Sequence, residues 1–498
     1  MSILSSAIKF RTPSSPSQIL VKKIVEIMTE KQKEEDVHPS HNRACLCRPL
    51  NIPRTKPTND VYNALKDFCV TDEDLKKYMR LFMADLHKGL AKATHPKSIV
   101  KCYPTYIQDL PTGQEVGKYL ALDLGGTNFR VILVELQKNH FEMTSRTFVI
   151  PGEKMRGSGK DLFDHVATCL KVFIVEQKLD NECLPLGFTY SFPLVQKAID
   201  KGIIERWTKG FKCEDVIGED VVKVLQEALV RKGIQKNVNV KAVINDTAGT
   251  LIACAWKSPY CRIGLIVGTG TNACYVEKQQ NAEMFDAANH GSGVVLINCE
   301  WGAFGDDGSL DFIRRPEDVE IDKGSINPGK QLHEKMISGM YMGELVRLLI
   351  LKCVKDGSIF GGKSSSELNQ KDKFLTKYVS DIESDKPGTY DKCKAILESL
   401  GLKNITEVDF QNVRYICECV SRRAAFMCAA GLATLIKKTE EKRVTVGIDG
   451  SVYRYHPYFH HLMVEKMRQL VTPGVVFDLM LSEDGSGRGA ALTAASAS

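Results

Sequence analysis

The sequence predicts an α/β protein in which sheets are covered by helices, and three observations support this. Apolar, β-branched runs alternate with longer stretches of helical spacing from Asp60 onward. A strand–Gly/Thr turn–strand unit occurs twice, within residues 118–136 and 262–278. The 498 residues are 43% apolar and 26% charged, an ordinary globular composition that excludes wholesale disorder, collagen-like chains and coiled coils.

The elements follow in order from these patterns. Residues 118–124 and 129–136 flank two glycines and predict a hairpin. Residues 161–179 have helical spacing, 184–190 read as a strand, and a strand at 238–245 runs into a helix at 246–257. A second hairpin, 262–267 with 272–278, precedes helical stretches at 330–356 and 409–438 and a strand at 443–449.

Residues 1–60 differ from the rest and are interpreted as an N-terminal extension and linker. They hold 10 basic and 6 acidic side chains, and so carry +4 of the formal charge of +6. Residues 17–36 fit an amphipathic helix, and the Pro-rich stretch 48–57 fits a linker. The first 25 residues faintly resemble an organelle-targeting segment, but a cytosolic tail is preferred. A partner or organelle contact through 1–60, including association with mitochondria, is the alternative.

The remaining chain is close to neutral, so we expect no nucleic-acid partner. No apolar run reaches the roughly 18 residues of a membrane span. The 16 cysteines contain no CxxC pair, which favours reduced thiols in a cytoplasmic protein and predicts no transition-metal site.

The two hairpins share a turn sequence. Gly126-Thr127-Asn128 is repeated as Gly270-Thr271-Asn272, and Asp449-Gly450-Ser451 is a looser third copy. The repetition predicts two similar lobes facing one another, although common turn chemistry could produce it by coincidence. In the first hairpin, Gly125 and Gly126 let backbone amides approach a phosphate, and Asp123 at the strand end can hold Mg²⁺ directly or through water.

Four further segments could carry chemistry or could be purely structural. Residues 357–364 (GSIFGGKS) fit the Walker A expression, but a helix precedes them instead of the required strand, so we reject a P-loop. Asp246 ends a strand and begins a helix, which suits a general base in a crevice. The alternative is ordinary helix capping by Asp246 or Thr247. The loops 188–193 and 207–211 suit a wall around a small polar ligand, or are half-buried surface loops.

Taken in order, these segments resemble the hexokinase family. The matching motifs are LDLGGTNFR (122–130), GFTYSFP (187–193), DKGII (200–204), RWTKGF (206–211), INDTAGT (244–250), VGTGTNACYVE (267–277), EWGAFGDDG (300–308), NPGKQLHEK (327–335), YMGELVRL (341–348), IDGSVYR (448–454) and SEDGSGRGAAL (482–492). They extend over nearly all of the chain outside the N-terminal extension.

The resemblance implies the actin-like, ribonuclease H-like fold with a hinged cleft, as one catalytic unit. It implies a large lobe of residues 61–116 and 247–487 and a small lobe of 117–246 and 488–498. The implied reaction is the first step of glycolysis, transfer of the ATP γ-phosphoryl to the 6-hydroxyl of glucose or a related hexose, with Mg²⁺. The expected substrates are therefore a hexose and MgATP, and a monomer is expected.

The resemblance also assigns residues. Asp246 corresponds to the catalytic base and Lys209 to a catalytic cation. The sugar contacts would be Ser191, Thr208, Lys209, Asn245, Asp246, Asn272, Glu300 and Glu334. The ATP contacts would be Asp123, Gly125, Gly126, Thr127, Asn128, Arg130, Gly268, Thr269, Gly270, Asp449, Gly450, Ser451, Gly485 and Ser486, with Asp123 as the Mg²⁺ residue.

The sequence departs from the family pattern at two positions, and three rival functions share some of its features. Thr271 stands where many relatives have Cys or Ser, and Arg422 where Thr is frequent. The rivals are an ATP-dependent enzyme of the same superfold acting on another molecule, a non-catalytic sugar sensor, and an actin-like polymer. The intact sugar residues disfavour the first and third, and the intact Asp246, Lys209 and phosphate loops disfavour the second.

Overall fold

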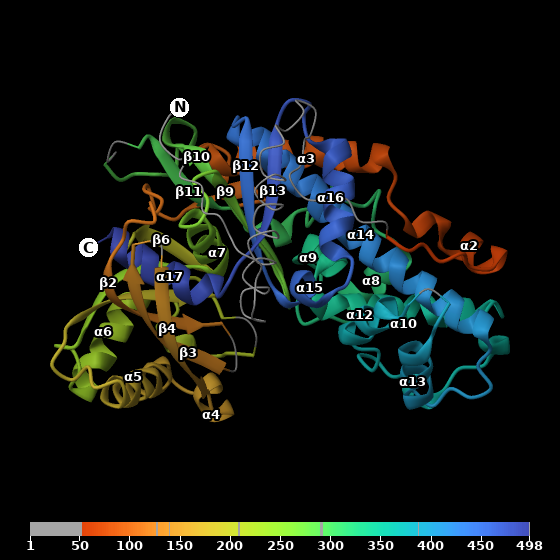
Figure 1. The fold of residues 1–498 in the computed structure, drawn as a ribbon, viewed down its shortest axis with the longest axis horizontal. Coiled ribbons are helices and arrows are strands. Elements are labelled where there is room, and N and C mark those ends of the chain that lie inside the picture. Colours follow the sequence, from red (N-terminus) through yellow and green to blue (C-terminus); the bar gives the residue numbers. More distant parts are fainter. Residues whose placement is uncertain are drawn as a thin grey trace, which may run out of the picture. The chain divides into compact units, whose positions relative to one another are not determined.

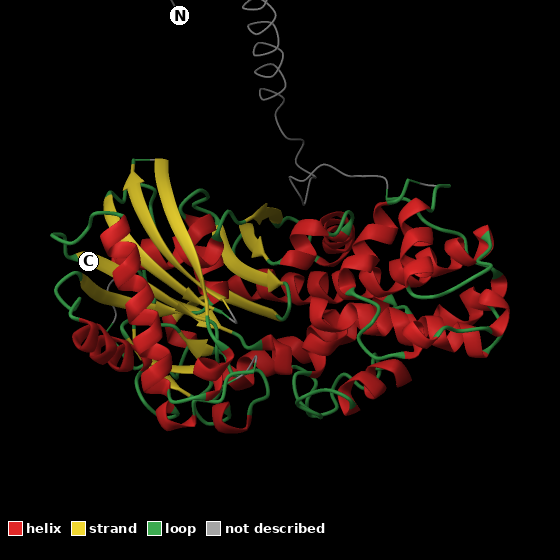
Figure 2. Cartoon of the chain, turned by 90° about the horizontal axis from the view of Figure 1, so that it is seen from below, coloured by secondary structure: helices red, strands yellow, loops and turns green. Residues whose placement is uncertain are grey.

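The computed structural model describes residues 52–125, 128–138, 140–207, 210–288, 292–386 and 388–497. The helix expected at 17–36, the targeting-like segment and the first part of the linker lie outside these residues. Within them the predicted mixture of strands and helices is confirmed. Strands gather on one side, and helices fill the other side (Figures 1 and 2).

The strands of the described residues form two main sheets with the same plan. The first has the order β4 (His140–Val149), β3 (Asn128–Gln137), β2 (Gly117–Leu124), β5 (Leu184–Tyr190), β8 (Val238–Ile244). The second has the order β1 (Tyr103–Pro104), β11 (Val294–Asn298), β10 (Thr271–Lys278), β9 (Cys261–Val267), β12 (Arg443–Asp449), β13 (Val476–Leu481). A small ribbon pairs β6 (Leu194–Ala198) with β7 (Lys201–Ile204).

The pairing shows that the repeated turn sequence marks a duplicated unit. In each main sheet an antiparallel hairpin, β2–β3 or β9–β10, is joined on one side to two parallel strands. Both predicted hairpins are therefore confirmed, and they occupy equivalent places in the two sheets. The third copy differs, because β12 leads into a short helix and not into a second hairpin strand.

The helices of the described residues cover these sheets and build the helical side. They are α2 (Asn59–Leu65), α3 (Asp72–Leu90), α4 (Gly152–Arg156), α5 (Gly159–Glu176), α6 (Val221–Lys232), α7 (Asp246–Ala255), α8 (Pro316–Lys323), α9 (Leu332–Ile337), α10 (Gly339–Lys355), α11 (Ser366–Asn369), α12 (Thr376–Ser384), α13 (Asp391–Ser399), α14 (Glu407–Thr439), α15 (Ser451–Tyr455), α16 (Phe459–Leu470) and α17 (Gly485–Ser496). Short 3₁₀ turns are η1 (Lys66–Phe68), η2 (His95–Lys97), η3 (Glu214–Val216), η4 (Gln279–Asn281), η5 (Trp301–Ala303) and η6 (Phe360–Gly362).

Two helices each pack on the main sheet to which their preceding strand does not belong. Helix α7 follows β8 of the first sheet but packs on β9 and β12 of the second, whereas α17 follows β13 and packs on β5 and β2. The helices meet at Gly249 and Gly489, where a Cβ on Gly489 would lie 2.1 Å from the Gly249 carbonyl oxygen. This close approach brings the first turns of α7 and α17 together at the boundary between the two sheets.

Helix α14 is the long helix of the helical side (Figure 1). Of the described helices it alone is long and apolar enough to cross a membrane, but 94% of its most apolar window is buried inside the protein. It packs against α3, α10, α12 and α16. A helix so covered by its own chain is the core helix of a folded domain.

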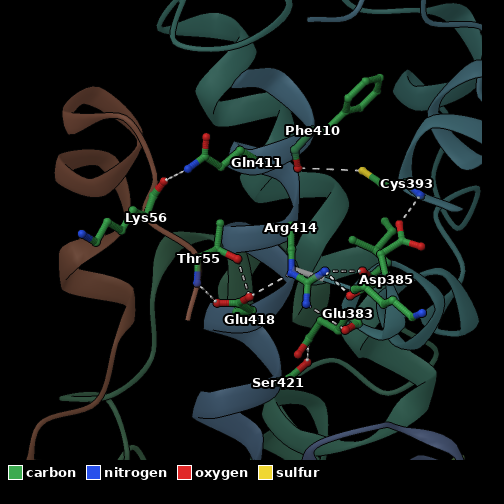
Figure 3. A network of polar contacts seen from close by, with 12 residues as sticks. Thr55, Lys56, Glu383, Asp385, Cys393, Phe410, Gln411, Arg414, Glu418 and Ser421 are labelled. Atoms are coloured by element: carbon green, nitrogen blue, oxygen red, sulfur yellow. Dashed lines mark hydrogen bonds and ion pairs between the residues drawn. The ribbon is translucent and has the colours of Figure 1, made fainter. Parts of the chain in front are cut away.

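The described part of the expected linker is held on α14. Thr55 donates its hydroxyl and its amide to the Glu418 carboxylate, at 2.6 and 3.1 Å, and Arg414 donates to the same carboxylate at 3.2 Å (Figure 3). The Thr58 amide donates to the Asn412 side chain at 2.9 Å. Residues 52–58 are therefore a docked segment, although their proline content suggested a spacer.

The helical stretch predicted at 330–356 is wrong in one respect, because it is two helices. Ser338 between α9 and α10 is extended, with ψ of 158°. The Gly339 amide donates to the Gly268 carbonyl at 2.8 Å, so a tertiary contact with the β9–β10 turn stabilises the break. Helix α10 precedes residues 357–364, which supports rejecting the P-loop.

Candidate active site

The predicted base lies at the start of α7. The side chain of Asn245 accepts from the Ala248 amide at 2.9 Å and caps the helix. Neither capping alternative, Asp246 or Thr247, is the capping residue. The cap therefore does not use the Asp246 carboxylate. Among the described residues, the buried Asn245 Nδ2 has no hydrogen-bond partner, which is costly unless a ligand or water satisfies it.

A second polar group stands at the ends of β10 and β11. The Asn272 amide donates to Asn298 at 2.8 Å and to Glu300 at 3.2 Å, and the Asn298 amide donates to Glu300 at 2.8 Å. Burial raises the pKa of Glu300, and the negative charge of Asp246 raises it further. The two predicted carboxylates are thus close enough to repel each other electrostatically.

The backbone of Glu300 is unusual, with φ of 56° and ψ of 47°. A left-handed conformation is uncommon for a residue other than glycine, and such conformations cluster at functional sites. The next residue, Trp301, is fully buried and donates its ring N–H to the Thr271 hydroxyl at 3.1 Å. Thr271, one of the two departures from the family pattern, is therefore part of the support for Glu300.

Glu334 approaches the same group from α9. Its carboxylate accepts from the Thr271 amide at 2.9 Å. A Cβ on Gly270 would lie 2.5 Å from Glu334 Oε2, so the glycine leaves room for this carboxylate. The neighbouring His333 holds α9 in place, since Nδ1 bonds the Trp301 carbonyl at 3.1 Å and Nε2 bonds the Tyr78 hydroxyl at 2.7 Å.

Ser191 reaches the site from the end of β5. Its amide donates to the Leu124 carbonyl at 3.1 Å, which joins the ends of β2 and β5. A Cβ on Gly125 would lie 3.7 Å from Ser191 Oγ. Four predicted residues, Thr208, Lys209, Gly126 and Thr127, lie outside the described residues, as does the side chain of Asn128.

Three residues that the resemblance assigns to ATP, Asp123, Arg130 and Ser486, form an ionic network with Asp484. Arg130 on β3 donates to Asp123 at 2.8 Å, to Asp484 at 2.6 Å and to the Ser486 hydroxyl at 3.1 Å. Ser486 in turn donates to Asp123 at 2.7 Å. Burial opposes the charge on Arg130, but the two carboxylates outweigh it and raise the pKa of its guanidinium.

The two glycine turns of the second sheet lie against each other. A Cβ on Gly450, whose φ is 113°, would lie 2.3 Å from the Val267 carbonyl oxygen, and one on Gly268 would lie 3.4 Å from the Gly450 Cα. Thr269 accepts from the Met340 amide at 3.2 Å, and Ser451 begins α15. Asp449 accepts from the Gly485 amide at 3.3 Å and from Arg454 at 2.9 Å.

The structure therefore brings the described candidates into two adjoining groups. By the roles that the resemblance assigns, the sugar-side group comprises Asn245, Asp246, Asn272, Glu300 and Glu334, and the phosphate-side group comprises Asp123, Gly125, Arg130, Gly268, Thr269, Gly270, Asp449, Gly450, Ser451, Gly485 and Ser486. Ser191, the remaining sugar candidate, lies beside Gly125. Sequence reasoning missed two participants, Asn298 and Asp484. Asn298 stands two residues before Glu300, a strand-like spacing that could have identified it, and Asp484 lies within a quoted motif but received no role.

Family models and curated proteins match most of this chain. Residues 60–256 and 262–496 each match a family model described as hexokinase. Human hexokinase-2 is 47% identical over 435 residues, which cover 86% of this chain and 47% of the relative. Rat hexokinase-2 is 46% identical over 465 residues, which cover 92% of this chain and 50% of the relative. The chain thus spans about half the length of these curated relatives.

Solved structures match over nearly their whole length. The hexokinase from Schistosoma mansoni complexed with glucose is 42% identical, covers 88% of this chain and is itself covered to 98%, with a TM-score of 0.81. Another solved hexokinase is 30% identical, with the same two coverages and a TM-score of 0.76.

Proposed function

Because this chain belongs to the hexokinase family, we propose that it transfers the γ-phosphoryl group of MgATP to the 6-hydroxyl of glucose and related hexoses. One observation carries most weight. At the start of α7, next to Asp246, the buried Nδ2 donor of Asn245 has no partner among the described residues. A hydroxyl-bearing ligand would satisfy this donor, and the similar Schistosoma mansoni enzyme was solved with glucose.

At the sugar site, carboxylate and amide side chains would hydrogen-bond the hydroxyl groups of the hexose. Glu300, Asn272 and Asn298 already hydrogen-bond one another, so their orientation is set before a hexose arrives. We assign direct sugar contacts to Ser191, Asn245, Asp246, Asn272, Glu300 and Glu334, and by family resemblance to Thr208 and Lys209. A site built to bond each hydroxyl rejects analogues lacking one by factors up to about 10⁴–10⁵.

Asp246 is proposed as the general base that takes the proton of the 6-hydroxyl. It stands at the first position of α7, and Asn245 caps the helix in its place. The negative charge of Asp246 contributes to the raised pKa of Glu300, so the two carboxylates lie in one electrostatic environment. The transferred phosphoryl group needs little covalent help from the protein, so orientation and charge supply most of the rate.

The phosphate-side residues fit MgATP. The turns at Gly268 and Gly450 are in backbone contact. The Gly268 amide donates to the Gly270 carbonyl at 2.9 Å and the Gly450 amide to the Asp449 carboxylate at 2.7 Å, so phosphate oxygens would have to replace these bonds to accept from the two amides. Asp123 and Asp449 supply the oxygen ligands that Mg²⁺ prefers, directly or through water. Mg²⁺, when bound, would neutralise charge on the phosphates. Arg130 would then give up its bond to Asp484 and donate to a phosphate of the nucleotide. The family resemblance assigns Lys209 to the γ-phosphoryl group.

The duplicated sheets support a hinged pair of lobes. We propose the lobe boundaries stated from the sequence, with 61–116 and 247–487 as the large lobe and 117–246 with 488–498 as the small lobe. Residues at the first turns of α7 and α17 would then stand where the lobes meet. Closure on the sugar would keep water from accepting the phosphoryl group. A monomer in the cytoplasm remains the expectation, and a contact made by residues 1–60 remains its alternative.

The decisive experiment measures ADP release from MgATP with and without glucose. Wild-type chain should show glucose-dependent turnover, and Asp246→Ala should lower it by at least about 10²-fold because the base is lost. Asp180→Ala, at an exposed position, is the matched control and should retain full activity. Glucose-independent turnover would favour another acceptor, and glucose binding without turnover would favour a sensor.

A further inference from the structure

Two cysteine thiols meet where the N-terminal part of the described chain packs against α14. The sulfur atoms of Cys69 and Cys419 are 4.0 Å apart, although the residues are 350 positions apart in the sequence. Cys69 follows η1 in the short connection to α3, and Cys419 lies on α14. Both are free thiols in this structure.

The two thiols differ in access and in charge. Cys69 is half-buried, whereas Cys419 is 1% exposed behind it. The hydrogen bond with Cys419 lowers the pKa of Cys69 to about 7, and it prevails over burial with help from the guanidinium groups of Arg422, Arg423 and Arg315. The pKa of Cys419 is raised, so of the two sulfurs Cys69 is the one that begins to ionise near neutral pH, and Cys419 stays a thiol. The thiolate is the form that reacts with oxidants.

Contacts of the neighbouring residues fix the positions of Cys69 and Cys419. Arg423 lies over the ring of Phe68, with 3.9 Å between its guanidinium carbon and the ring centre, and it pairs with Asp318 at 2.6 Å. Thr55 is bonded to Glu418, the residue before Cys419 (Figure 3). A disulfide needs its sulfur atoms at about 2.05 Å. The sulfur atoms must therefore approach by about 2 Å. The extended connection that contains Cys69 would move, because Cys419 is fixed in a long helix.

We propose that Cys69 and Cys419 are an oxidative modification site, in which a peroxide converts the two thiols into a disulfide that fastens the N-terminal segment to α14. The Cys69 thiolate attacks one peroxide oxygen, which forms the Cys69 sulfenic acid and releases hydroxide. Cys419 sulfur then attacks Cys69 sulfur and releases water, and the two thiol protons end in water. Overall, two thiols and one hydrogen peroxide give one disulfide and two waters.

A second thiol pair provides an internal contrast. Cys102 and Cys299 also interact through their sulfur atoms, but both side chains are fully buried. Peroxide therefore has no access to that pair in the folded chain. Cys183 is exposed, but the described residues place no other thiol in hydrogen-bonding distance of it. These cysteines should remain unlinked while Cys69 and Cys419 join.

The test treats the full chain with about one equivalent of hydrogen peroxide per protein. Remaining thiols are then blocked with N-ethylmaleimide, and the unreduced digest is analysed by mass spectrometry. A peptide pair joining Cys69 to Cys419 is expected in wild type and in Cys102→Ser, and it should disappear in Cys69→Ser. Dithiothreitol should reverse the link. The oxidised wild type should unfold at a higher temperature than the reduced wild type, and oxidation should not raise that temperature in Cys69→Ser.

Three outcomes would overturn the proposal. They are a Cys69 that stops at the sulfenic or sulfinic acid, a Cys69 linked to a different cysteine, and a Cys102–Cys299 link formed as fast as Cys69–Cys419. Cys69→Ser is the variant compared with wild type because Cys69 lies in a half-buried connection, so its substitution should not disturb α14. Glucose-dependent turnover of Cys69→Ser should equal that of wild type, because this residue lies outside both groups of the active site.

Discussion

The guanidinium of Arg130 lies 2.6 Å from a carboxylate oxygen of Asp484, although 354 positions separate the two residues in the sequence. The same guanidinium bonds Asp123 at 2.8 Å. Arg130 belongs to the first hairpin, and Asp484 stands directly before α17. The pair therefore joins the phosphate-side residues of the first sheet to those that follow the second sheet, and MgATP would have to rearrange it.

Arg130→Ala should weaken the use of MgATP more than the use of hexose. A charge-assisted hydrogen bond is worth about 1.5–3 kcal/mol, so we expect the KM for MgATP to rise about 10- to 100-fold with little change in the KM for glucose. Steady-state kinetics with each substrate varied would show this. Arg146→Ala, on the exposed strand β4, is the control. An unchanged KM for MgATP would remove Arg130 from the nucleotide site.

Gly270→Ala should damage the sugar side. Its Cβ would lie 2.5 Å from Glu334 Oε2, so the carboxylate must move away from the Thr271 amide. We expect the KM for glucose to rise at least about 10-fold, the loss of a charged hydrogen bond. Gly324→Ala meets no atom closer than 3.4 Å and should behave as wild type. A normal KM for glucose in Gly270→Ala would argue against Glu334 as a sugar contact.

His333 should make stability depend on acid. Burial lowers its pKa to about 3, so it stays neutral in the folded chain, while the unfolded chain takes up a proton below about pH 6.5. Stability is therefore lost as pH falls through this window, by about 1 kcal/mol from this residue between pH 6 and 5. Urea unfolding at the two pH values measures it. His333→Gln should be less stable at pH 7 but should show a smaller drop on acidification, and an equal drop would contradict this assignment.

Gly489→Ala should destabilise the crossing of α7 and α17. The new methyl group would lie 2.1 Å from the Gly249 carbonyl oxygen, with no flexible side chain to yield. Overpacking of this kind costs about 1–3 kcal/mol, and calorimetric unfolding would detect it. Ser496→Ala, at the exposed end of the same helix, should leave the unfolding temperature unchanged. Equal stability of Gly489→Ala and wild type would mean that the helices separate easily.

Local patterns predicted the two hairpins because residues 118–136 and 262–278 have apolar runs broken by glycine turns, but they did not predict β1, β4, β6, β7, β11 or β13. The break at Ser338 was missed, since helical spacing continues across it and only the contact of Gly339 with the β9–β10 turn reveals it. The capping residue was also missed by one position, because Asn245 and Asp246 are both good capping residues. Asn298 and Asp484 acquire their roles from partners on other elements, which no local pattern encodes.

By itself the sequence determined the family and the duplicated hairpin, because motifs, turn glycines and apolar periodicity act over a few residues. Only the tertiary structure decided that α7 and α17 exchange sheets, that Arg130 joins Asp123 to Asp484, and that Cys69 meets Cys419. These relationships join residues far apart in the chain. Their geometry depends on how whole sheets and helices pack, and packing is a property of the assembled core.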